Sequence, residues 1–461
     1  MAEALNLKGK RVLVVGLGKS GVAAAQFLHE LGARVTASDA KAEDELRGDI
    51  RALLDLGVTV ETGGHGERTF RQQDLIVVSP GVPTGVPQLA QAKAMGIPVI
   101  GEIELASRFL KGHVVAITGS NGKTTTTALV GSVIAWGGYE SLVGGNIGTP
   151  AISLVRESTE DTYNVLEVSS FQLESIQSFH PQFAVVLNIT PDHLDRHGSF
   201  EAYLGAKKRI FENQTASDYA ILNADDPQCE KLKNAGRAQV RWFSRKKEVV
   251  QGAFVRDERI LHRDDSGEHE IVPVSEIPLK GAHNLENVLA AVCVGMLVPC
   301  EPHRIRAAIK EFKAVEHRLE YVNSVNGVEF YNDSKATNVD ATIKALESFP
   351  GNIHIILGGK DKGFPYTVLQ PLLQQRAKRV YTIGAAASKI EKEIAGAVEI
   401  VHAETLENAV RRAFEAASPG DTVLLAPACA SFDQFESYEH RGRVFKDLVQ
   451  SLAEKKQAIS S

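Results

Sequence analysis

The segment that most constrains the fold is an apolar run that leads directly into a turn with two glycines. Its sequence is Val114-Val115-Ala116-Ile117-Thr118-Gly119-Ser120-Asn121-Gly122-Lys123-Thr124-Thr125. A strand, such a turn and a helix that begins at a lysine form a cradle for phosphate groups, because the N–H groups of the turn and the positive end of the helix face the same anion. The general pattern has a glycine where this chain has Ile117, so we predict a shortened phosphate-binding loop.

The residues of this turn have different roles in binding a nucleoside triphosphate. Two glycines let the backbone bend, Lys123 adds a full positive charge, and the hydroxyl of Thr124 is placed to bind Mg²⁺. The nucleotide-binding residues predicted here are Gly119, Ser120, Asn121, Gly122, Lys123, Thr124 and Thr125.

Composition excludes several other classes of protein. The 461 residues are 43% hydrophobic and 23% charged, which is ordinary for a globular chain of about three domains. A formal net charge of −6 without a long basic run gives no reason to expect nucleic acid or a membrane as partner. Four cysteines without a C-x-x-C pair, no signal segment and no 18-residue apolar run together predict a cytoplasmic protein.

Three blocks of alternating strands and helices follow one another along the chain. The first, predicted as domain 1–105, has strands at 11–15 and 75–78, and a strand that ends near Asp39. Between the first strand and Asp39 lie the turn Gly16-Leu17-Gly18-Lys19-Ser20-Gly21 and a helix. This βαβ pattern predicts a Rossmann-like domain.

The other two blocks are predicted as domains 106–314 and 315–461. Strands are expected at 114–118, 163–168 and 183–188 in the central block, and at 328–331, 353–357, 379–383 and 422–426 in the last. Residues 240–277 contain short β-like pieces around charged turns and are predicted to be an excursion from the core layers. The fold class is therefore α/β, with mostly parallel sheets.

Several polar residues follow strands of the central block, where parallel sheets place their ligands. Glu167 would bind Mg²⁺ there, or alternatively cap a helix. His193 would reach the same metal from the next strand, although a lone histidine is more often structural. Lys207, in a run of three cations, is interpreted from composition alone as a solvated surface residue. Asn284 would pair with an adenine edge or cap a helix.

A second polar cluster lies in the last block. The segment Asn332-Asp333-Ser334-Lys335-Ala336-Thr337-Asn338 places acid, amine, hydroxyl and amide groups between a strand and a helix, which suits a substrate with carboxylates. An elaborate helix cap is the alternative. Lys362 and Ser431 follow later strands and are expected at the same site. Arg318 is a candidate for phosphate or ribose, or a surface arginine.

With these motifs in view, the chain resembles the Mur ligase family over all three blocks. Residues 117–124 resemble the shortened phosphate loop of that family, which accounts for the absent glycine. Residues 144–148 and 167–174 are similar to further family motifs. Residues 332–338 and 431–435 resemble the members that add D-glutamate in particular.

The resemblance implies a fold and an activity. The fold would comprise an N-terminal Rossmann-like domain for a uridine nucleotide, a central P-loop ATPase-type domain and a C-terminal Rossmann-like domain for the amino acid. The activity would be ATP-dependent addition of D-glutamate to UDP-N-acetylmuramoyl-L-alanine through an acyl phosphate, a step in making peptidoglycan precursors. The substrates would be small molecules, and the protein a monomer.

Site residues are also implied by the resemblance. The catalytic residues would be Lys123, Glu167, His193 and Lys207. One Mg²⁺ would be held by Thr124 and Glu167, and a second by His193. CO₂ would carbamylate Lys207 and so make it an anionic metal ligand. Asn284, Arg318 and Asp333 would contact ATP. The remaining substrate-binding residues would be Leu17, Lys19, Ser20, Asp39 and Gly81 for the uridine nucleotide, Asn146 and His193 near the acceptor carboxylate, and Lys335, Thr337, Lys362, Ser431, Phe432 and Tyr438 for D-glutamate.

The chain departs from the family pattern at some positions, and some of its features also suggest other classes of protein. Ala40 and Lys41 stand where the family pattern has a hydroxyl residue and an arginine. A folylpolyglutamate-type ligase shares the phosphate loop and also adds glutamate. A nicotinamide-dependent dehydrogenase is suggested by the glycine pattern at 16–21 with Asp39, but this fingerprint alone is weak. A non-enzymatic nucleotide-binding module would not need the polar groups after the loop.

Overall fold

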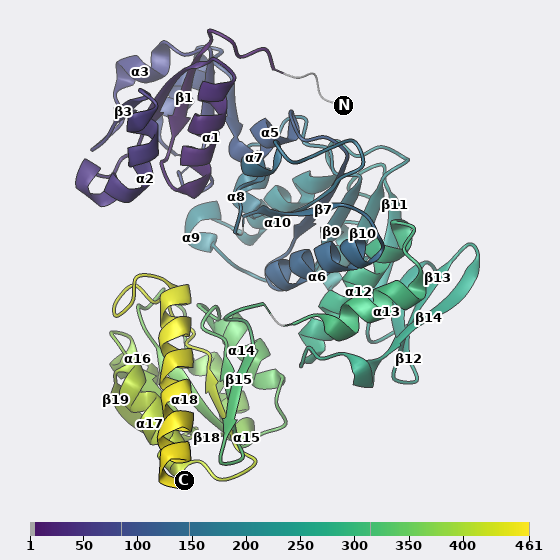
Figure 1. Ribbon diagram of the computed structural model, residues 1–461, viewed down its shortest axis with the longest axis vertical. Coiled ribbons are helices and arrows are strands. Elements are labelled where there is room, and N and C mark those ends of the chain that lie inside the picture. The colour runs from purple at the N-terminus through teal and green to yellow at the C-terminus, as the bar shows by residue number, and fades with distance from the viewer. Residues whose placement is uncertain (1–4, 84, 147, 314, 461) are drawn as a thin grey trace. The chain divides into compact units, whose positions relative to one another are not determined.

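The computed structural model describes residues 5–83, 85–146, 148–313 and 315–460. These residues form three β-sheets, each with helices packed around it (Figure 1). They fall into two compact units: Met1–Glu276 with Glu286–Lys310, and Ile277–Leu285 with Glu311–Ser461. The predicted α/β class with mostly parallel sheets is confirmed. Ile147 of the predicted motif at 144–148 and the predicted boundary at 314 lie outside the described residues. The three predicted domain ranges stay predictions.

The first sheet is parallel and has the predicted Rossmann-like order β3-β2-β1-β4-β5. Its strands are β1 (Arg11–Val15), β2 (Arg34–Ser38), β3 (Thr59–Glu61), β4 (Leu75–Val78) and β5 (Val99–Gly101). Its helices are α1 (Lys19–Glu30), α2 (Glu43–Asp55), α3 (Glu67–Arg71), α4 (Pro87–Ala94) and α5 (Glu102–Ser107). The turn between β1 and α1 requires glycine at Gly21, because a Cβ there would lie 1.8 Å from the carbonyl oxygen of Gly16.

The second sheet has the order β14-β13-β12-β11-β10-β9-β6-β8-β7 within the described part of the chain. Its strands are β6 (His113–Thr118), β7 (Ser141–Gly145), β8 (Tyr163–Glu167), β9 (Phe183–Val186), β10 (Tyr219–Asn223), β11 (Gln239–Ser244), β12 (Gly252–Arg256), β13 (Arg259–Asp264) and β14 (Gly267–Pro273). The helices around it are α6 (Lys123–Trp136), α7 (Ala151–Leu154), α8 (Ser170–Leu173), α9 (Leu194–His197), α10 (Phe200–Lys208), α11 (Pro227–Lys231), α12 (Ala282–Leu297) and α13 (Pro302–Glu311), with short 3-10 turns at Arg209–Phe211 and Val274–Glu276.

One prediction about this sheet was wrong. Residues 240–277 are not an excursion from the core layers, because β11 pairs with β10 and β12 pairs with β11, both parallel, so that the sheet continues into them. Only β13 and β14 turn antiparallel. The charged residues that suggested an excursion form ion pairs on these strands, such as Arg263 with Glu268, and leave apolar residues such as Phe254 buried.

The described residues of the second unit form one sheet, ordered β15-β16-β20-β17-β18-β19, in which only β15 is antiparallel. Its strands are β15 (Glu320–Val325), β16 (Val328–Asn332), β17 (Ile353–Gly358), β18 (Ala377–Ile383), β19 (Glu399–Glu404) and β20 (Thr422–Leu425). Its helices are α14 (Val339–Glu347), α15 (Gln370–Arg376), α16 (Ala387–Glu393), α17 (Leu406–Ala416) and α18 (Tyr438–Ser460), with a 3-10 turn at Thr367–Leu369.

Apolar clusters cover both faces of this last sheet. Leu357 and Leu424 belong to the cluster on one face, and Ile356 and Val423 to the cluster on the other, as alternation along a strand requires. Helix α18, yellow in Figure 1, packs beside α17 and β15. None of the helices in the described ranges is both long and apolar enough to cross a membrane.

Helix α5 lies between the first two sheets in the chain. Two of its acidic residues bind backbone groups of the central domain and so fix the helix in place. Glu102 accepts a hydrogen bond from the Ile152 N–H at 2.8 Å, at the start of α7. Glu104 accepts from the N–H groups of the 177–179 turn and pairs with Arg108 at 2.7 Å. Both glutamates and Leu105 are buried. The predicted boundary at residue 105 therefore falls inside a packed helix.

The burial of Glu102 predicts a pH dependence of stability. Burial raises the pKa of Glu102 from 4.5 to about 7, against the hydrogen bonds from Ile152 and Ala151. Between these two values the unfolded chain loses its proton first, so the folded state binds more protons and stability falls as pH rises. We expect Glu102→Gln to gain unfolding free energy relative to wild type between pH 5 and pH 8, by up to about 3 kcal/mol. Urea unfolding at several pH values measures this difference.

Glu104 provides the control of opposite sign. Burial alone would raise the pKa of Glu104, but the hydrogen bonds from Gln177, Ser178 and Arg108 lower it overall. Glu104→Gln should therefore lose stability at neutral pH, and the loss should shrink as the pH falls below the ordinary glutamate value. Equal pH profiles for the two variants would contradict this account of α5.

Candidate functional site

The loop between β6 and α6 has the geometry of a phosphate cradle. Gly119 has φ of +155° and Gly122 has φ of +85°, and Gly122 is the residue that precedes the first turn of α6. A Cβ on Gly122 would lie 2.3 Å from the side-chain oxygen of Asn287, so both conformation and space require glycine there. The predicted strand, turn and helix are thus observed, and Lys123 begins the helix.

Two lysines converge on this loop. Lys123 Nζ donates to the carbonyl oxygens of Gly119 and Ser120, both at 2.9 Å. Lys207 Nζ donates to the same Gly119 oxygen at 2.9 Å and to the hydroxyl of Thr118 at 3.3 Å. Lys207 comes from α10, 88 residues away from Gly119 in sequence. The two amines therefore lie at the edge of one loop.

Lys207 is not the solvated cation that its composition suggested, and that interpretation was wrong. Its side chain is 1% exposed, and both of its hydrogen-bond partners are neutral oxygens. Burial first, and then the positive charge of Lys123, hold the pKa of Lys207 well below its ordinary value. Burial thus favours the neutral amine, which is the form that reacts with CO₂.

Glu167 lies beside the loop with its carboxylate facing Thr124. Glu167 ends β8, where it pairs with Ile117 of β6, and its Oε2 accepts from the Thr124 hydroxyl at 2.8 Å. Asn146 Nδ2 donates to the other oxygen at 3.1 Å. The alternative of a helix cap was wrong, because Ser169 caps α8. A buried hydroxyl and carboxylate are oxygen ligands of the kind Mg²⁺ prefers.

His193, the residue predicted to bind a second Mg²⁺, lies in an exposed turn. His193 has φ of +52°, precedes α9 and keeps about half of its side chain exposed. Its Nε2 lies 3.6 Å from an oxygen of Asp192, and its ring packs against Phe171. No group of three or more His, Cys, Asp or Glu residues arranged for a metal occurs in the described ranges, so the predicted metal sites depend on Thr124 and on Lys207.

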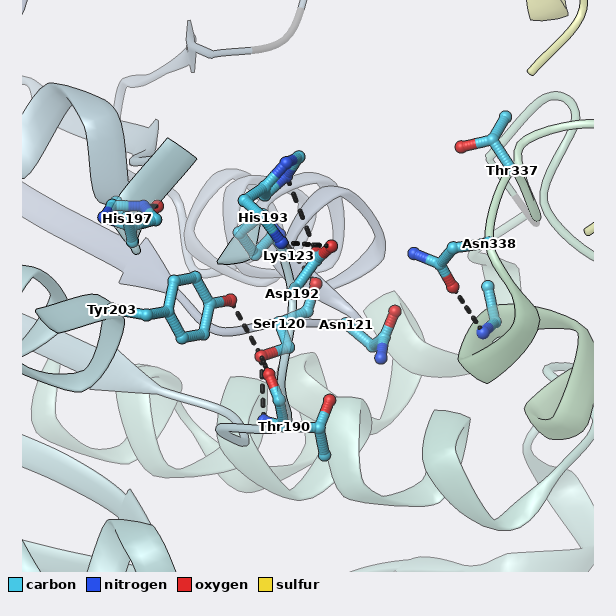
Figure 2. Close-up of polar contacts among 12 residues, drawn as sticks. Ser120, Asn121, Lys123, Thr190, Asp192, His193, His197, Tyr203, Thr337 and Asn338 are labelled. Atoms are coloured by element: carbon cyan, nitrogen blue, oxygen red, sulfur yellow. Dashed lines mark hydrogen bonds and ion pairs between the residues drawn. The ribbon is translucent and has the colours of Figure 1, made fainter. Parts of the chain in front are cut away.

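Figure 2 shows how Ser120 connects the phosphate loop to the segment before His193. The Ser120 hydroxyl donates to the Thr190 carbonyl at 2.8 Å, accepts from the Thr190 N–H at 2.9 Å and lies 2.8 Å from the Tyr203 hydroxyl. Tyr203 also packs its ring 4.8 Å from Lys207 Nζ. Sequence reasoning missed Tyr203, because an aromatic residue in an amphipathic helix is typical of a core position.

The first sheet carries a second loop at the carboxyl ends of its strands. Asp39 Oδ2 accepts from the Leu17 N–H at 2.6 Å and Oδ1 from the Lys41 N–H at 2.9 Å. Lys19 and Ser20 begin α1, and Gly81 is exposed after β4. Both oxygens of Asp39 therefore bind backbone, which differs from the ribose-binding acid of a dinucleotide fingerprint.

A cavity of about 390 Å³ lies between the first two sheets. Pro80 and Val82 line it from the N-terminal side, and Phe171, Gln172 and Arg196 from the central side. Arg196 donates to the carbonyl oxygens of Pro80 and Val82 at 3.0 and 2.7 Å. Pro80 and Val82, on either side of Gly81, and Phe171, whose ring packs against His193, therefore line the same cavity.

The second unit places the other predicted residues around the carboxyl ends of β16, β17 and β20. Asp333 is buried and accepts from the Leu319 N–H at 3.2 Å; burial raises its pKa to about 6, although Arg318 opposes this. Arg318 Nε is buried without a hydrogen-bond partner among the described residues. Asn284, in the first turn of α12, is also buried and donates to the carbonyl of Lys280, which precedes that helix, at 2.7 Å.

The residues predicted for an amino-acid substrate lie on three loops of this unit and at Tyr438, the first residue of α18. Lys362 Nζ donates to the Thr337 hydroxyl at 3.2 Å, and Lys335 Nζ lies 5.4 Å from the Tyr438 ring. Ser431 is buried, whereas Phe432 is 69% exposed. The segment at 332–338 is also more than a helix cap, because Asn338 alone caps α14.

Sequence reasoning missed Arg441, which joins these loops. Its guanidinium is fully buried and donates to the Ser334 hydroxyl and carbonyl at 3.0 and 2.9 Å, and to the Cys429 carbonyl at 3.2 Å. Burial lowers the pKa of Arg441 to about 10. An arginine near the start of a polar helix is typical of a surface residue, so no local signal marks it.

Taken with the fold, the phosphate loop and the buried oxygen pair define a P-loop enzyme that acts on a nucleoside triphosphate. Comparison with known proteins assigns the chain more narrowly: it belongs to the Mur ligase family, whose members are ATP-dependent, amide-bond-forming enzymes that use Mg²⁺. Family models match residues 10–101 (Mur ligase MurD-like, N-terminal domain), 117–295 (Mur ligase middle domain) and 317–429 (Mur ligase, glutamate ligase domain). The predicted enzyme class is confirmed.

Similar proteins cover almost the whole chain. A UDP-N-acetylmuramoylalanine--D-glutamate ligase of Koribacter versatilis is 66% identical over 98% of this chain and 99% of its own. The protein of the same name from Acidobacterium capsulatum is 59% identical over 96% and 97%. Among solved structures, the MurF ligase of Thermotoga maritima in complex with ADP has a TM-score of 0.62 at 16% identity, covering 92% of this chain and 95% of its own, and so shares the fold.

Proposed function

We propose that this chain joins D-glutamate to the L-alanine carboxyl group of UDP-N-acetylmuramoyl-L-alanine and converts ATP to ADP and phosphate in doing so. The observation that carries the proposal is the 66% identity, over nearly the full length, to a relative that bears this activity in its name. The cluster of half-buried Lys123 with the buried residues Thr124, Glu167 and Lys207 supports the phosphoryl-transfer step.

The chemistry explains why ATP is needed. A carboxylate is a poor acylating agent, because its leaving group would be oxide. Transfer of the γ-phosphoryl group to the carboxylate of L-alanine gives an acyl phosphate, whose leaving group is phosphate. The amine of D-glutamate then attacks the carbonyl carbon, and the tetrahedral intermediate expels phosphate to leave the amide.

The residues of the first unit have distinct roles in this proposal. Lys123 and the start of α6 stabilise negative charge on the transferring phosphoryl group. Thr124 and Glu167 would hold one Mg²⁺, and His193 with a carbamate on Lys207 would hold a second. The metal ions would supply positive charge that stabilises the transferring phosphoryl group. Asn146 and His193 face the acceptor carboxylate.

The remaining assignments follow the loops at strand ends. We assign the uridine nucleotide to the loop of Leu17, Lys19, Ser20, Asp39 and Gly81. We assign the base, phosphate and ribose of ATP to Asn284, Arg318 and Asp333, where the unpartnered Nε of Arg318 offers a hydrogen-bond donor. We assign D-glutamate to Lys335, Thr337, Lys362, Ser431, Phe432 and Tyr438.

Two alternatives are less well supported. A folylpolyglutamate-type ligase would not need a first domain that matches the MurD-like N-terminal model. A dehydrogenase would need a free acid after β2 for the ribose, but both oxygens of Asp39 accept backbone hydrogen bonds. Because ATP is a co-substrate and one chain carries all the assigned residues, we propose that the enzyme works as a monomer in the cytoplasm.

An assay of phosphate release tests this function. We expect release only when ATP, UDP-N-acetylmuramoyl-L-alanine and D-glutamate are all present, since the acyl phosphate needs the acceptor and turnover needs the amine. Each substrate is omitted in turn, and L-glutamate replaces D-glutamate in a further reaction. Release with L-glutamate and a folate acceptor, but not with the uridine nucleotide, would assign the chain to the other ligase group.

A further inference from the structure

Asn188 binds the phosphate loop from the segment that follows the neighbouring strand. It lies two residues beyond β9, which pairs in parallel with β6, the strand that leads into the loop. The backbone pairing continues past both strands: the Leu187 N–H donates to the Thr118 carbonyl at 3.0 Å, and the Ser120 N–H donates to the Asn188 carbonyl at 2.9 Å. Backbone hydrogen bonds therefore align the start of the loop with residues 187–188.

The side chain of Asn188 extends this pairing by one more residue. Its Oδ1 accepts from the Asn121 N–H at 2.8 Å, and its Nδ2 donates to the Asn121 carbonyl at 3.1 Å. One planar amide thus binds both polar groups of Asn121, which lies between the two glycines of the loop. Glycines on both sides leave this stretch with more backbone freedom than other residues would, so a fixed partner has a large effect on its conformation.

The same segment is anchored from its other side. Asn223 Nδ2 donates to the Leu187 carbonyl at 2.9 Å, and Asp226 Oδ2 accepts from the Ile189 N–H at 2.9 Å. Asp226 is itself fixed, because it caps α11. Directly after Ile189 the chain reaches Thr190, which binds Ser120, and then Asp192 and His193.

We propose that Asn188 is a positioning residue that holds the phosphate loop in register with the turn carrying His193. This inference rests on the proposed function for the roles of the loop and of His193. The N–H groups of Ser120 and Asn121 bind Asn188, so the phosphates of ATP are bound by the remaining N–H groups at the start of α6 and by Lys123. The side chain of Asn188 binds backbone groups of the loop, and in this way it sets the direction in which those donors point.

Asn188→Ala tests the proposal, with Asn213→Ala as its matched control. Asn213 is also half-buried, and its side chain also makes two hydrogen bonds to backbone, both from Nδ2 to carbonyl oxygens, those of Gln177 and Phe179, away from the loop. Titration calorimetry of the full chain with Mg·ATP should show an affinity about tenfold or more weaker for Asn188→Ala, as expected for the loss of two hydrogen bonds. Asn213→Ala should bind Mg·ATP as wild type does.

Two further readouts separate positioning from a general loss of structure. The KM for ATP should rise in Asn188→Ala while the KM for D-glutamate stays unchanged. Hydrogen exchange should become faster in peptides covering 117–125 and stay unchanged in those covering 353–383. Wild-type affinity for Mg·ATP in folded Asn188→Ala, or equal weakening in Asn213→Ala, would overturn the proposal.

Asn188→Asp keeps the experiment decisive if the alanine variant does not fold. Aspartate has the same shape and keeps the acceptor for the Asn121 N–H, but it loses the donor and places a negative charge beside the phosphates. It should also weaken Mg·ATP binding, and unchanged affinity would overturn the proposal. Because calorimetry and exchange need neither the acceptor nor D-glutamate, a chain that shows these effects but adds no D-glutamate would refute the proposed function alone.

Discussion

Replacing Lys207 with alanine should slow ligation by about a hundredfold to a thousandfold, the range found when one preorganised group that stabilises a transition state is removed. The physical reason is the environment of its amine. A buried amine with neutral hydrogen-bond partners is poorly suited to remain an ammonium ion, whereas its carbamate would supply anionic oxygens for a metal. Steady-state phosphate release with saturating substrates measures the loss.

A carbamate also predicts chemical rescue. A short carboxylic acid such as acetate should restore part of the activity of Lys207→Ala, because it can place a carboxylate in the space left by the side chain. Wild-type enzyme in ¹³C-bicarbonate should show a carbamate carbon signal that Lys207→Ala lacks. The exposed neighbour Lys208 is the control, and Lys208→Ala should keep full activity. Full activity of Lys207→Ala without added acid would remove the carbamate from the mechanism.

Glu167→Gln should have an effect of similar size, with a different signature. The amide is isosteric and can still accept from the Thr124 hydroxyl, but it lacks the negative charge that attracts Mg²⁺. At the Mg²⁺ concentration that is sufficient for wild type, we expect the ligation rate to fall by about a hundredfold or more. The rate should recover in part as the Mg²⁺ concentration is raised. A titration of initial rate against Mg²⁺ measures both effects.

Two other variants define what Glu167→Gln reports. Thr124→Ser keeps the hydroxyl and should stay active, whereas Glu160→Gln changes an exposed glutamate and should leave the Mg²⁺ titration unchanged. If Glu167→Gln had the Mg²⁺ requirement of wild type, the carboxylate would serve only to orient Thr124, and the metal would be held elsewhere.

The local parts of the fold could be predicted because each depends on consecutive residues. An apolar run with glycines after it is enough to predict β6, the loop and α6, and the same reasoning found β1 with its turn. The strands after residue 239 were missed as part of the central sheet, because their solvent-facing charges, such as Arg256 and Glu268, interrupt the apolar pattern. Which neighbour a strand pairs with is not a local property.

The candidate site divides in the same way. Lys123, Thr124 and Glu167 could be named because each lies next to a strand end, and parallel strands end at one edge of a sheet. Arg441 and Asn188 could not be named, because their roles consist of bonds to backbone groups of segments distant in sequence. Backbone groups are the same at every position and leave no trace in the residue pattern.

The phosphate loop, the α/β fold and the motifs of the family could be predicted from the sequence alone, because each depends on short runs of residues. The packed structure was needed to find that Lys207 is buried against Gly119, that Glu102 and Glu104 bind backbone groups of the central domain, and that Asn188 binds the backbone of Asn121. Burial and hydrogen-bond partners depend on how several elements pack together. For this reason Lys207 can be buried although it stands in a run of three cationic residues.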